Sequence, residues 1–384
     1  MNIVILTPDF PPYSEHNEGM GGIATWLYET AEGITGCGHT CTVLCPRKER
    51  NAEAAFDSAS SFETVRFKRF LWRHFRYLLL FRLLSSCIRK HEDNVFISGI
   101  GTLCHLPVFF SRFFSYRSAT FVHGNDGLRI RKSAKLKKAL ARCGVIITNS
   151  SYTTGLVREM TDSRSTVLRM NPFFSPDRYP PEDRKYTEKL AERLGMTDRK
   201  VLFTAGRLIE RKNHLLVLEA LRNIVAQYPE ICYCIAGDGP YRSVIEKRVA
   251  EYGLRDHVIM TGFVSQKDLR SLYETADIFI MASSETADSV EGFGIVFLEA
   301  NFFGTPVIGS RTGGIEDAVE DGINGLLVSP DSASELEQAI LKLLDSPELR
   351  TELGKRGAER VSDTFSRTGS VKSLLNELLK EPSE

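Results

Sequence analysis

Residues 2–45, NIVILTPDFPPYSEHNEGMGGIATWLYETAEGITGCGHTCTVLC, contain the succession of patterns that decides the fold. Residues 2–7 form a short apolar run rich in β-branched side chains, which predicts a buried parallel strand. A loop with prolines and glycines follows, then a helical pattern over about residues 23–34 and a second strand over 42–45. A strand, a glycine-rich loop, a helix and a second strand make a βαβ unit. The first domain is therefore predicted to be α/β with a parallel sheet.

The same alternation runs along the rest of the chain. Further strands are expected at residues 95–98, 119–122, 145–148, 201–204, 231–236, 258–261, 277–281 and 306–308. Four prolines between Met170 and Pro181 leave little room for regular structure, which predicts a linker there. We therefore expect a Rossmann-like domain over residues 1–170, a linker over 171–181, a second Rossmann-like domain over 182–366, and a helix over 367–384 that packs back on the first domain. The fold class is α/β, with two doubly wound domains facing across a cleft, where such sheets bind ligands outside the carboxyl ends of their strands.

Composition and charge set the broad class. The chain has 384 residues, 42% of them hydrophobic, which is typical of a globular protein of about two domains. Its 49 basic and 49 acidic residues cancel, which argues against a generic nucleic-acid binder. The balance is uneven, because residues 1–175 carry an excess of 9 positive charges and residues 176–384 an excess of 9 negative ones. The first half is thus expected to face something anionic.

Targeting and cysteine patterns predict a cytoplasmic protein. The first 12 residues lack a basic stretch and carry Asp9, unlike a signal peptide, and no apolar run approaches the roughly 20 residues that span a bilayer. Eight cysteines in a chain of this length fit a reducing compartment. The regular spacing of Cys37, Cys41 and Cys45 leaves a metal site as an alternative, but buried thiols explain it better, since these residues lie in or beside strand-like runs.

Two cations follow the strand at 201–204. Gly206 lets the chain leave the strand sharply, and Arg207 and Lys212 then project from the loop and the start of the next helix. An Arg fork and a compact Lys charge together suit a diphosphate. The alternative is a solvated helix N-terminus with ordinary salt bridges. Because the helix dipole disfavours cations there, the functional interpretation gains weight.

Glycine-bearing turns follow the next two strands. Gly237 and Gly239 permit close approach of the backbone to a ligand, although a plain strand-to-helix turn explains them too. After Gly262, the backbone amides of Phe263 and Val264 are candidates to bind the edge of a nucleobase.

The segment EGFGIVFLEA, residues 291–300, is the most informative for chemistry. Its helical part begins at about Gly294, so the backbone N–H groups of Gly294, Ile295 and Val296 predict an anion site. Carboxylates beside a phosphate pocket suit sugar hydroxyls, which assigns Glu291 and Glu299 to hydrogen bonding with a sugar. A helix-surface carboxylate is the alternative for Glu299.

These motifs together resemble the retaining glycosyltransferases of family 4, which have the GT-B fold. The resemblance rests on E-x7-E at Glu291 and Glu299, the G-R-L-x-x-x-K set ending in Lys212, Gly21-Gly22, and Gly-Asp-Gly-Pro at residues 237–240. It covers nearly the whole chain and is strongest over about residues 200–330. It implies a retaining hexosyltransferase that uses a nucleotide-diphosphate sugar, needs no metal ion and carries no cofactor.

The resemblance also implies roles for individual residues. Arg207 and Lys212 would hold the donor diphosphate, Glu291 would contact the transferred sugar, and Glu299 would bind the ribose hydroxyls. Gly21 and Gly22 would form a glycine loop that closes over the donor phosphates. His123, at the carboxyl end of a predicted strand, is similar to the family's active-site histidine, although a lone histidine there is more often structural.

Two basic stretches lie in the first domain. Residues 66–90 contain eight Lys or Arg and no acid, and residues 128–142 contain seven without an acid. Taken as a helix, the first stretch places Arg66, Arg69, Arg73 and Arg76 on one face, which is typical of a helix lying on an anionic membrane. A core-packed helix with a solvated basic side is the alternative. No nucleic-acid recognition module is visible.

We therefore expect a glycosyltransferase that moves a sugar from a UDP- or GDP-sugar to a glycan or lipid-linked acceptor, in cell-surface polysaccharide or glycolipid synthesis. It would be peripheral on the cytoplasmic face of the membrane. The alternatives are a catalytically inactive scaffold subunit that binds glycans or nucleotide sugars, and a nucleotide-sugar epimerase on the same fold.

Overall fold

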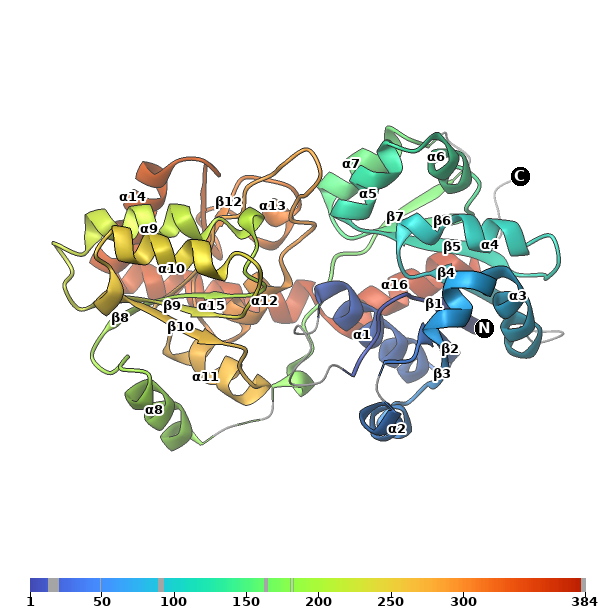
Figure 1. Ribbon diagram of the computed structural model, residues 1–384, viewed down its shortest axis with the longest axis horizontal. Coiled ribbons are helices and arrows are strands. Elements are labelled where there is room, and N and C mark those ends of the chain that lie inside the picture. The colour runs from blue at the N-terminus through green and yellow to red at the C-terminus, as the bar shows by residue number, and fades with distance from the viewer. Residues whose placement is uncertain are drawn as a thin grey trace. The chain divides into compact units, whose positions relative to one another are not determined.

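The computed structural model describes residues 1–12, 21–48, 50–88, 93–161, 165–179, 181 and 183–380. The chain divides into two compact units, both visible in Figure 1. Unit 1 contains the chain up to Pro172 together with the last helix, α16 (Arg367–Leu379), and unit 2 runs from Phe173 to Ser366.

Unit 1 is built on one parallel sheet of seven strands in the order β3-β2-β1-β4-β5-β6-β7. Its strands are β1 (Asn2–Leu6), β2 (Thr40–Pro46), β3 (Glu63–Phe67), β4 (Asn94–Ser98), β5 (Arg117–Val122), β6 (Val145–Thr148) and β7 (Thr166–Arg169). Besides α16, its helices are α1 (Gly22–Gly36), α2 (Arg50–Ala59), α3 (Arg69–Cys87), α4 (His105–Phe110), α5 (Gly124–Arg131), α6 (Ala134–Leu140) and α7 (Ser151–Arg158). Every residue of β1 is buried, as expected of a parallel strand covered on both faces.

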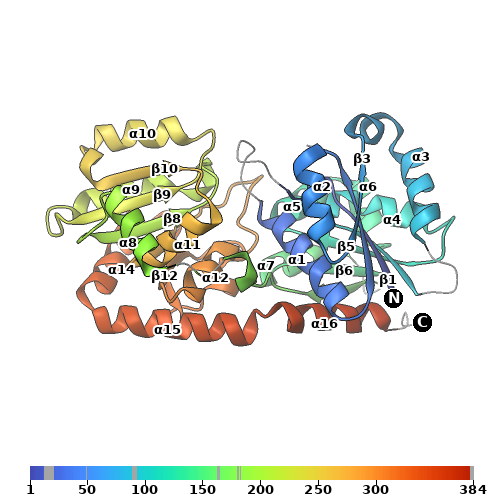
Figure 2. The ribbon, with the colours of Figure 1, turned by 90° about the horizontal axis from the view of Figure 1, so that it is seen from below.

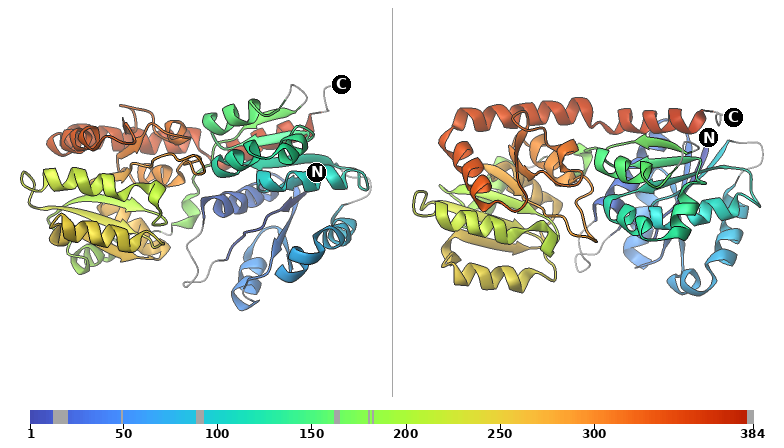
Figure 3. Two further views of the ribbon diagram at one scale, coloured as in Figure 1. Left: turned by 45° about the horizontal axis from the view of Figure 1, so that its top comes forward. Right: turned by 90° about the horizontal axis from the view of Figure 1, so that it is seen from above.

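Unit 2 has a parallel sheet of six strands in the order β10-β9-β8-β11-β12-β13, with helices around it (Figure 3). The strands are β8 (Lys200–Ala205), β9 (Ile231–Ala236), β10 (Val258–Gly262), β11 (Ile278–Met281), β12 (Val307–Ser310) and β13 (Gly325–Val328). The helices are α8 (Arg184–Arg193), α9 (His214–Ile224), α10 (Arg242–Glu251), α11 (Gln266–Thr275), α12 (Ile295–Phe302), α13 (Ile315–Ala318), α14 (Ala333–Asp345) and α15 (Pro347–Thr364).

Both sheets follow the 3-2-1-4-5-6 strand order of the doubly wound fold, and unit 1 adds a seventh strand at one edge. The prediction of two α/β, Rossmann-like domains is therefore confirmed. In each sheet the strand order reverses next to its first strand, between β1 and β4 in unit 1 and between β8 and β11 in unit 2. Such switch points are where ligands bind in this fold.

Three strands were missed by the sequence patterns. β3 and β7 lie at sheet edges and are half exposed, so neither shows the apolar run of a buried strand. β13 is short and begins at Gly325, where a Cβ would meet the carbonyl of Val307 at 2.3 Å. Arg66, expected on a helix, lies in β3 instead.

The segment expected to be a linker packs within unit 2 over most of its described length. Phe174 donates a backbone hydrogen bond to Phe365, at 3.1 Å, and Tyr179 is buried against Phe174. Pro180 and Glu182 lie outside the described residues.

The last helix, α16, packs on α1 in unit 1 (Figure 2). Arg367 forms an ion pair of 2.8 Å with the buried Glu29, and Gly33 leaves room for Val371. Arg117 donates to the carbonyl of Leu378 at 2.7 Å, so the end of the helix is held as well. No helix in the described part of the chain is long and apolar enough to cross a membrane.

Candidate active site

Two interlocked loops follow β8 and β9, next to the switch point of unit 2. Gly206 follows β8 with φ of +146°, and its amide donates to the carbonyl of Ala236 at the end of β9. A Cβ on Gly237, whose φ is +137°, would lie 1.9 Å from the carbonyl oxygen of Gly206, and one on Gly239 would lie 2.3 Å from that of Leu208. Close packing of the loops therefore requires both glycines, whatever they do for a ligand.

A buried cluster of charges lies at this switch point. The carboxylate of Glu291 accepts hydrogen bonds of 2.6 Å from Lys212 and of 2.6 Å from Arg211. The Lys212 ammonium also contacts the sulfur of Met281, the last residue of β11, at 2.9 Å. The three charged side chains are only 11–13% exposed. Sequence motifs identified Lys212 and Glu291 and missed Arg211, which stands beside Lys212 in the same loop.

The cluster holds Glu291 in its ionised form. Burial alone would raise the pKa of Glu291, but the charges of Lys212 and Arg211 and their hydrogen bonds outweigh burial and lower that pKa to about 2. Burial lowers the pKa of Lys212, and attraction to Glu291 opposes this. At neutral pH, Glu291 is therefore a hydrogen-bond acceptor and has no proton to donate.

Three residues after Glu291, the chain turns into α12. Gly294 is the N-cap and has φ of +89°, a left-handed conformation that glycine adopts without strain. A Cβ there would also lie 2.7 Å from the ring of Phe297. The N–H groups of Ile295 and Val296 belong to the first turn, where a helix provides no partner for them. They are thus in the position that the predicted phosphate site requires.

Glu299 occupies a different environment from Glu291. It is 5% exposed, and one carboxylate oxygen accepts a hydrogen bond of 2.8 Å from the hydroxyl of Tyr273. The other oxygen is paired with Arg178 at 3.4 Å. The surface-carboxylate alternative is therefore wrong. Both oxygens already have protein partners, so binding of ribose by Glu299 stays a prediction.

The remaining donor-side candidates are more accessible. Arg207 is exposed, unlike the buried Lys212 with which it was grouped. Phe263 follows Gly262, whose φ is +71°, and its ring is 47% exposed. Val264 is half-buried.

In unit 1, His123 lies at the carboxyl end of β5, where the sequence placed it, but inside the protein. It is 4% exposed, its Nε2 lies 3.1 Å from the carbonyl oxygen of Gly99, and its ring packs edge-on against Trp26. The ring also accepts the backbone N–H of Asp126 as a helix cap. These contacts hold the His123 ring inside unit 1.

The glycine loop of unit 1 contrasts with that of unit 2. Gly21 caps α1 with φ of −63°, and a Cβ there would meet no atom within 4 Å. Gly22 begins α1, and both residues are exposed. Neither strain nor packing requires a glycine at position 21, which leaves a ligand as a reason for it.

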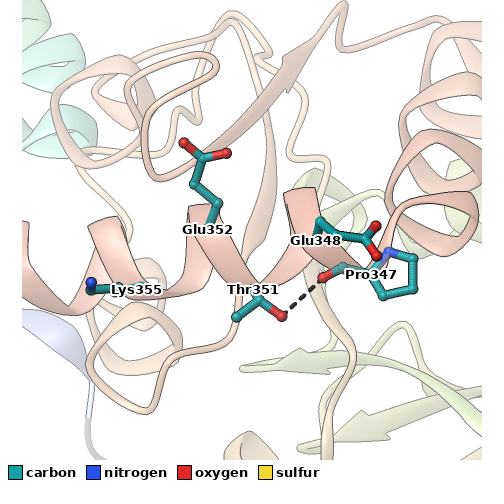
Figure 4. Close-up of a pocket in the computed structure, with 5 residues that line it drawn as sticks. All are labelled: Pro347, Glu348, Thr351, Glu352 and Lys355. Atoms are coloured by element: carbon teal, nitrogen blue, oxygen red, sulfur yellow. Dashed lines mark hydrogen bonds between the residues drawn. The ribbon is translucent and has the colours of Figure 1, made fainter.

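A pocket of unit 2 lies away from the candidate site residues. Figure 4 shows a pocket along α15 lined by Pro347, Glu348, Thr351, Glu352 and Lys355, none of them a predicted site residue. Within the described ranges, no three His, Cys, Asp or Glu side chains are grouped as a metal ion would need.

Comparison with known proteins assigns the family. Residues 187–360 match the family model of glycosyl transferases group 1, and residues 20–169 match that of glycosyltransferase family 4. A GDP-mannose-dependent alpha-(1-6)-phosphatidylinositol monomannoside mannosyltransferase of Mycolicibacterium smegmatis is 27% identical over 378 residues, 94% of each chain. A GDP-mannose-dependent monoacylated alpha-(1-6)-phosphatidylinositol monomannoside mannosyltransferase of Corynebacterium glutamicum is 25% identical over 389 residues, 99% of this chain and 98% of the other.

A solved structure agrees in fold. Anabaena HepE, crystallised in complex with UDP and glucose, is similar with a TM-score of 0.81 over 99% of this chain and 100% of its own, at 17% identity. The two family models together span most of the chain, and the chain belongs to the family 4 glycosyltransferases of GT-B fold. It is an enzyme, a glycosyltransferase, so the scaffold and epimerase alternatives are set aside.

Proposed function

We propose that this glycosyltransferase moves a hexose from a nucleoside diphosphate sugar to a glycan or lipid-linked acceptor, with retention at the anomeric carbon and without a metal ion. The observation that carries the proposal is the buried cluster at the switch point of unit 2. Lys212 and Arg211 face a single carboxylate, Glu291, so the cluster retains one positive charge. That charge and the N-terminus of α12 favour an incoming diphosphate.

The residues divide the reaction between them. As the bond from the anomeric carbon to the phosphate oxygen breaks, negative charge grows on the leaving diphosphate, and Lys212, Arg207 and the first-turn amides of α12 stabilise it. The ionised Glu291 accepts hydrogen bonds from sugar hydroxyls. The acceptor hydroxyl attacks from the face that the diphosphate leaves, and its proton passes to the departing phosphate oxygen. These groups do the work that a metal ion would otherwise do.

GDP-mannose is the first donor to test. The relatives similar over nearly the whole chain are named for GDP-mannose and for phosphatidylinositol mannoside acceptors. HepE was crystallised with UDP, but a likeness at 17% identity supports the fold alone. A lipid-linked acceptor in glycolipid or cell-surface polysaccharide synthesis is consistent with these names. All eight cysteines are free thiols, which fits a cytoplasmic location because thiols stay reduced there.

A panel of GDP- and UDP-sugars in a thermal-unfolding assay, without metal and with chelator present, tests the donor site. A donor at 100 times its dissociation constant should add about 2.7 kcal/mol to the free energy of unfolding. GDP-mannose should raise the midpoint, and Arg207→Ala should reduce the shift without altering the unliganded midpoint. A shift that appears only with added divalent metal would contradict the metal-free proposal, and the absence of any shift would contradict the donor site.

The anomeric outcome needs a separate measurement. With a soluble acceptor analogue, the coupling between anomeric proton and carbon in the product reports its configuration by NMR. An α-linked product from an α-linked donor is expected. A β-linked product would overturn the retaining assignment while leaving the donor site in place.

A further inference from the structure

Exposed apolar side chains gather on one part of unit 1. Among the described residues, eleven large apolar side chains are exposed, and six of them lie on α3 or just after α4. We call these six the α3 patch: Phe70 (63% exposed), Phe75 (53%), Tyr77 (44%), Leu78 (71%), Phe81 (44%) and Phe113 (58%). Single exposed apolar residues are ordinary, but a gathering of this kind marks an interaction surface.

The patch is held in place by the helix beneath it. α3 packs on the sheet of unit 1 through Leu80 and Leu84, both fully buried, so its other side is turned to solvent. Phe81 packs edge-on against Phe113 with ring centroids 5.8 Å apart, which joins α3 to the segment after α4. The aromatic rings are thus displayed on a fixed surface and are not folded into the core.

Phe70 and Phe75 extend the patch toward the start of α3. Their ring centroids are 6.4 Å apart, and the helix is interrupted at Phe75, where φ is −130° and ψ is 30°. Tyr77 continues it toward α4 through an edge-on contact of 5.0 Å with Phe109.

Exposed basic side chains lie on the same segments as the patch. Arg69, Arg73 and Arg82 are on α3, Lys68 directly precedes it, Arg112 is next to Phe113, and residues 66–88 contain no acidic residue. An apolar centre with a basic rim matches the interface of an anionic bilayer, where rings enter the headgroup boundary and cations meet lipid phosphates. A second copy of the chain would bring two basic rims together, which like-charge repulsion disfavours.

The structure changes which residues meet the membrane. Arg66 was expected on the membrane face, but it is buried in β3 and bonded to Asp57 at 2.8 Å. The stretch 128–142 exposes basic residues, yet its apolar Leu128, Ile130 and Leu140 are buried, so it offers charge without an inserting group.

We propose that the α3 patch inserts into the interface of an anionic lipid bilayer and places unit 1 on the surface that carries the acceptor. The proposal rests on the proposed lipid-linked acceptor and names the surface that brings the enzyme to it. Apolar insertion supplies most of the affinity, and the rim arginines select anionic lipid.

Co-sedimentation with vesicles tests the patch directly. The full chain should bind vesicles of equal parts phosphatidylglycerol and phosphatidylcholine, and bind pure phosphatidylcholine vesicles far less. Leu78→Asp with Phe81→Asp should weaken binding by about a hundredfold, since each buried side chain of this size is worth at least about tenfold. Arg73→Gln with Arg82→Gln should weaken binding to anionic vesicles and flatten its salt dependence.

Matched variants keep the test falsifiable. Val244→Asp and Ile323→Asp change exposed apolar residues of unit 2, and Lys135→Gln with Lys138→Gln removes charge from the second basic stretch. All of these should bind like the parent. Equal binding by the Leu78/Phe81 variant, equal loss in the Lys135/Lys138 variant, or no binding by the parent would each overturn the proposal. So would a dimeric parent that becomes monomeric in the patch variant without any vesicle binding.

A donor-side readout separates this proposal from the proposed function. Hydrolysis of the nucleotide sugar in the absence of acceptor should be unchanged in Leu78→Asp with Phe81→Asp, because the patch lies in unit 1 and the charge cluster in unit 2. Conversely, Lys212→Ala should abolish transfer and still bind vesicles. If the parent binds vesicles but does not turn over the donor, the proposed function is contradicted and the proposed membrane binding by the α3 patch is not.

Discussion

The two units share one strand order and differ in what they place at the carboxyl ends of their strands. Unit 2 buries an ionised Glu291 between Lys212 and Arg211, with a helix N-terminus three residues away. Unit 1 buries His123 in hydrogen bonds to the backbone, and its exposed charges lie elsewhere on its surface. One scaffold thus holds a buried charge cluster in unit 2 and a tightly packed histidine in unit 1. This difference comes from the loops, because the sheets are alike.

The largest expected effect comes from breaking the charge cluster. Glu291→Ala should reduce transfer by at least about a thousandfold, because the site loses a sugar-binding group and its preorganised cations. It should also lower the free energy of unfolding by about 3–5 kcal/mol, since two buried cations lose their partner. Single-turnover kinetics and denaturant unfolding measure the two effects. Arg207→Ala is the control for stability, because its side chain is exposed. Full transfer by Glu291→Ala would show that the charge cluster of unit 2 is not needed for the reaction.

His123→Ala tests what the buried histidine of unit 1 contributes to stability and to transfer. The change removes the bond to Gly99, the cap of α5 and a ring packed on Trp26, and we expect a loss of about 2–4 kcal/mol. Thermal unfolding measures it, with transfer assayed well below the midpoint. A midpoint that does not move would show that the interior bonds of His123 carry little stability. A loss of transfer in the folded variant is what the family-derived role of His123 predicts.

A pair of glycine variants compares the two glycine loops. Gly237→Ala should cost about 1–3 kcal/mol, because its φ is +137° and the added Cβ meets backbone at 1.9 Å. Gly21→Ala should change stability by less than about 0.5 kcal/mol, since its φ is ordinary and the space is open. Transfer by Gly21→Ala should nevertheless slow if phosphates approach that backbone. Unchanged stability and unchanged transfer would leave Gly21 without a role.

The smallest expected effect is a difference in acid response. The pKa of Glu291 is lowered to about 2, so its contribution to stability is complete above its ordinary value of 4.5 and is lost as the pH falls toward 2. Burial raises the pKa of Asp126 in unit 1, so protonation favours the folded form of that unit as the pH falls. Unit 2 should therefore lose protection from amide hydrogen exchange at a higher pH than unit 1.

The fluorescence of Trp26 and Trp72, the two tryptophans of the chain, follows the unfolding of unit 1, with which the hydrogen exchange of unit 2 is compared.

The variant Glu291→Gln tests the charge of Glu291. The difference in free energy of unfolding between this variant and the parent should shrink as the pH falls from 4.5 to 2. A difference that stays constant over that range would contradict the charge assignment of Glu291.

Local sequence patterns predicted most of the buried strands, with β13 as an exception. Residue type also explains helix starts: Ser332 caps α14, and its hydroxyl accepts the backbone N–H of Glu335 at 3.1 Å. The Glu335 carboxylate accepts the backbone N–H of Ser329 and does not complete a capping box with Ser332. Ser150 likewise caps α7. Edge strands such as β3 could not be recognised from the sequence, because their half-exposed residues show no regular pattern of apolar side chains.

Motifs named the candidate site residues, but they did not name the residues that contact them in the fold. Arg211 and Tyr273 have ordinary neighbours in sequence, and only folding brings Arg211 to Glu291 and Tyr273 to Glu299. The division between the exposed Leu78 and the buried Leu80 on α3 likewise required the structure, since both belong to one apolar run.

By itself the sequence determined the fold class, the domain order and the family, because these depend on the spacing of apolar runs, glycines and a few charged residues along the chain. Only the tertiary structure decided that Glu291 is ionised between two cations, that Glu299 is enclosed, and that the aromatic side of α3 remains exposed. The physical reason is that charge state and burial depend on neighbours in space, and those neighbours are up to 121 residues away in sequence.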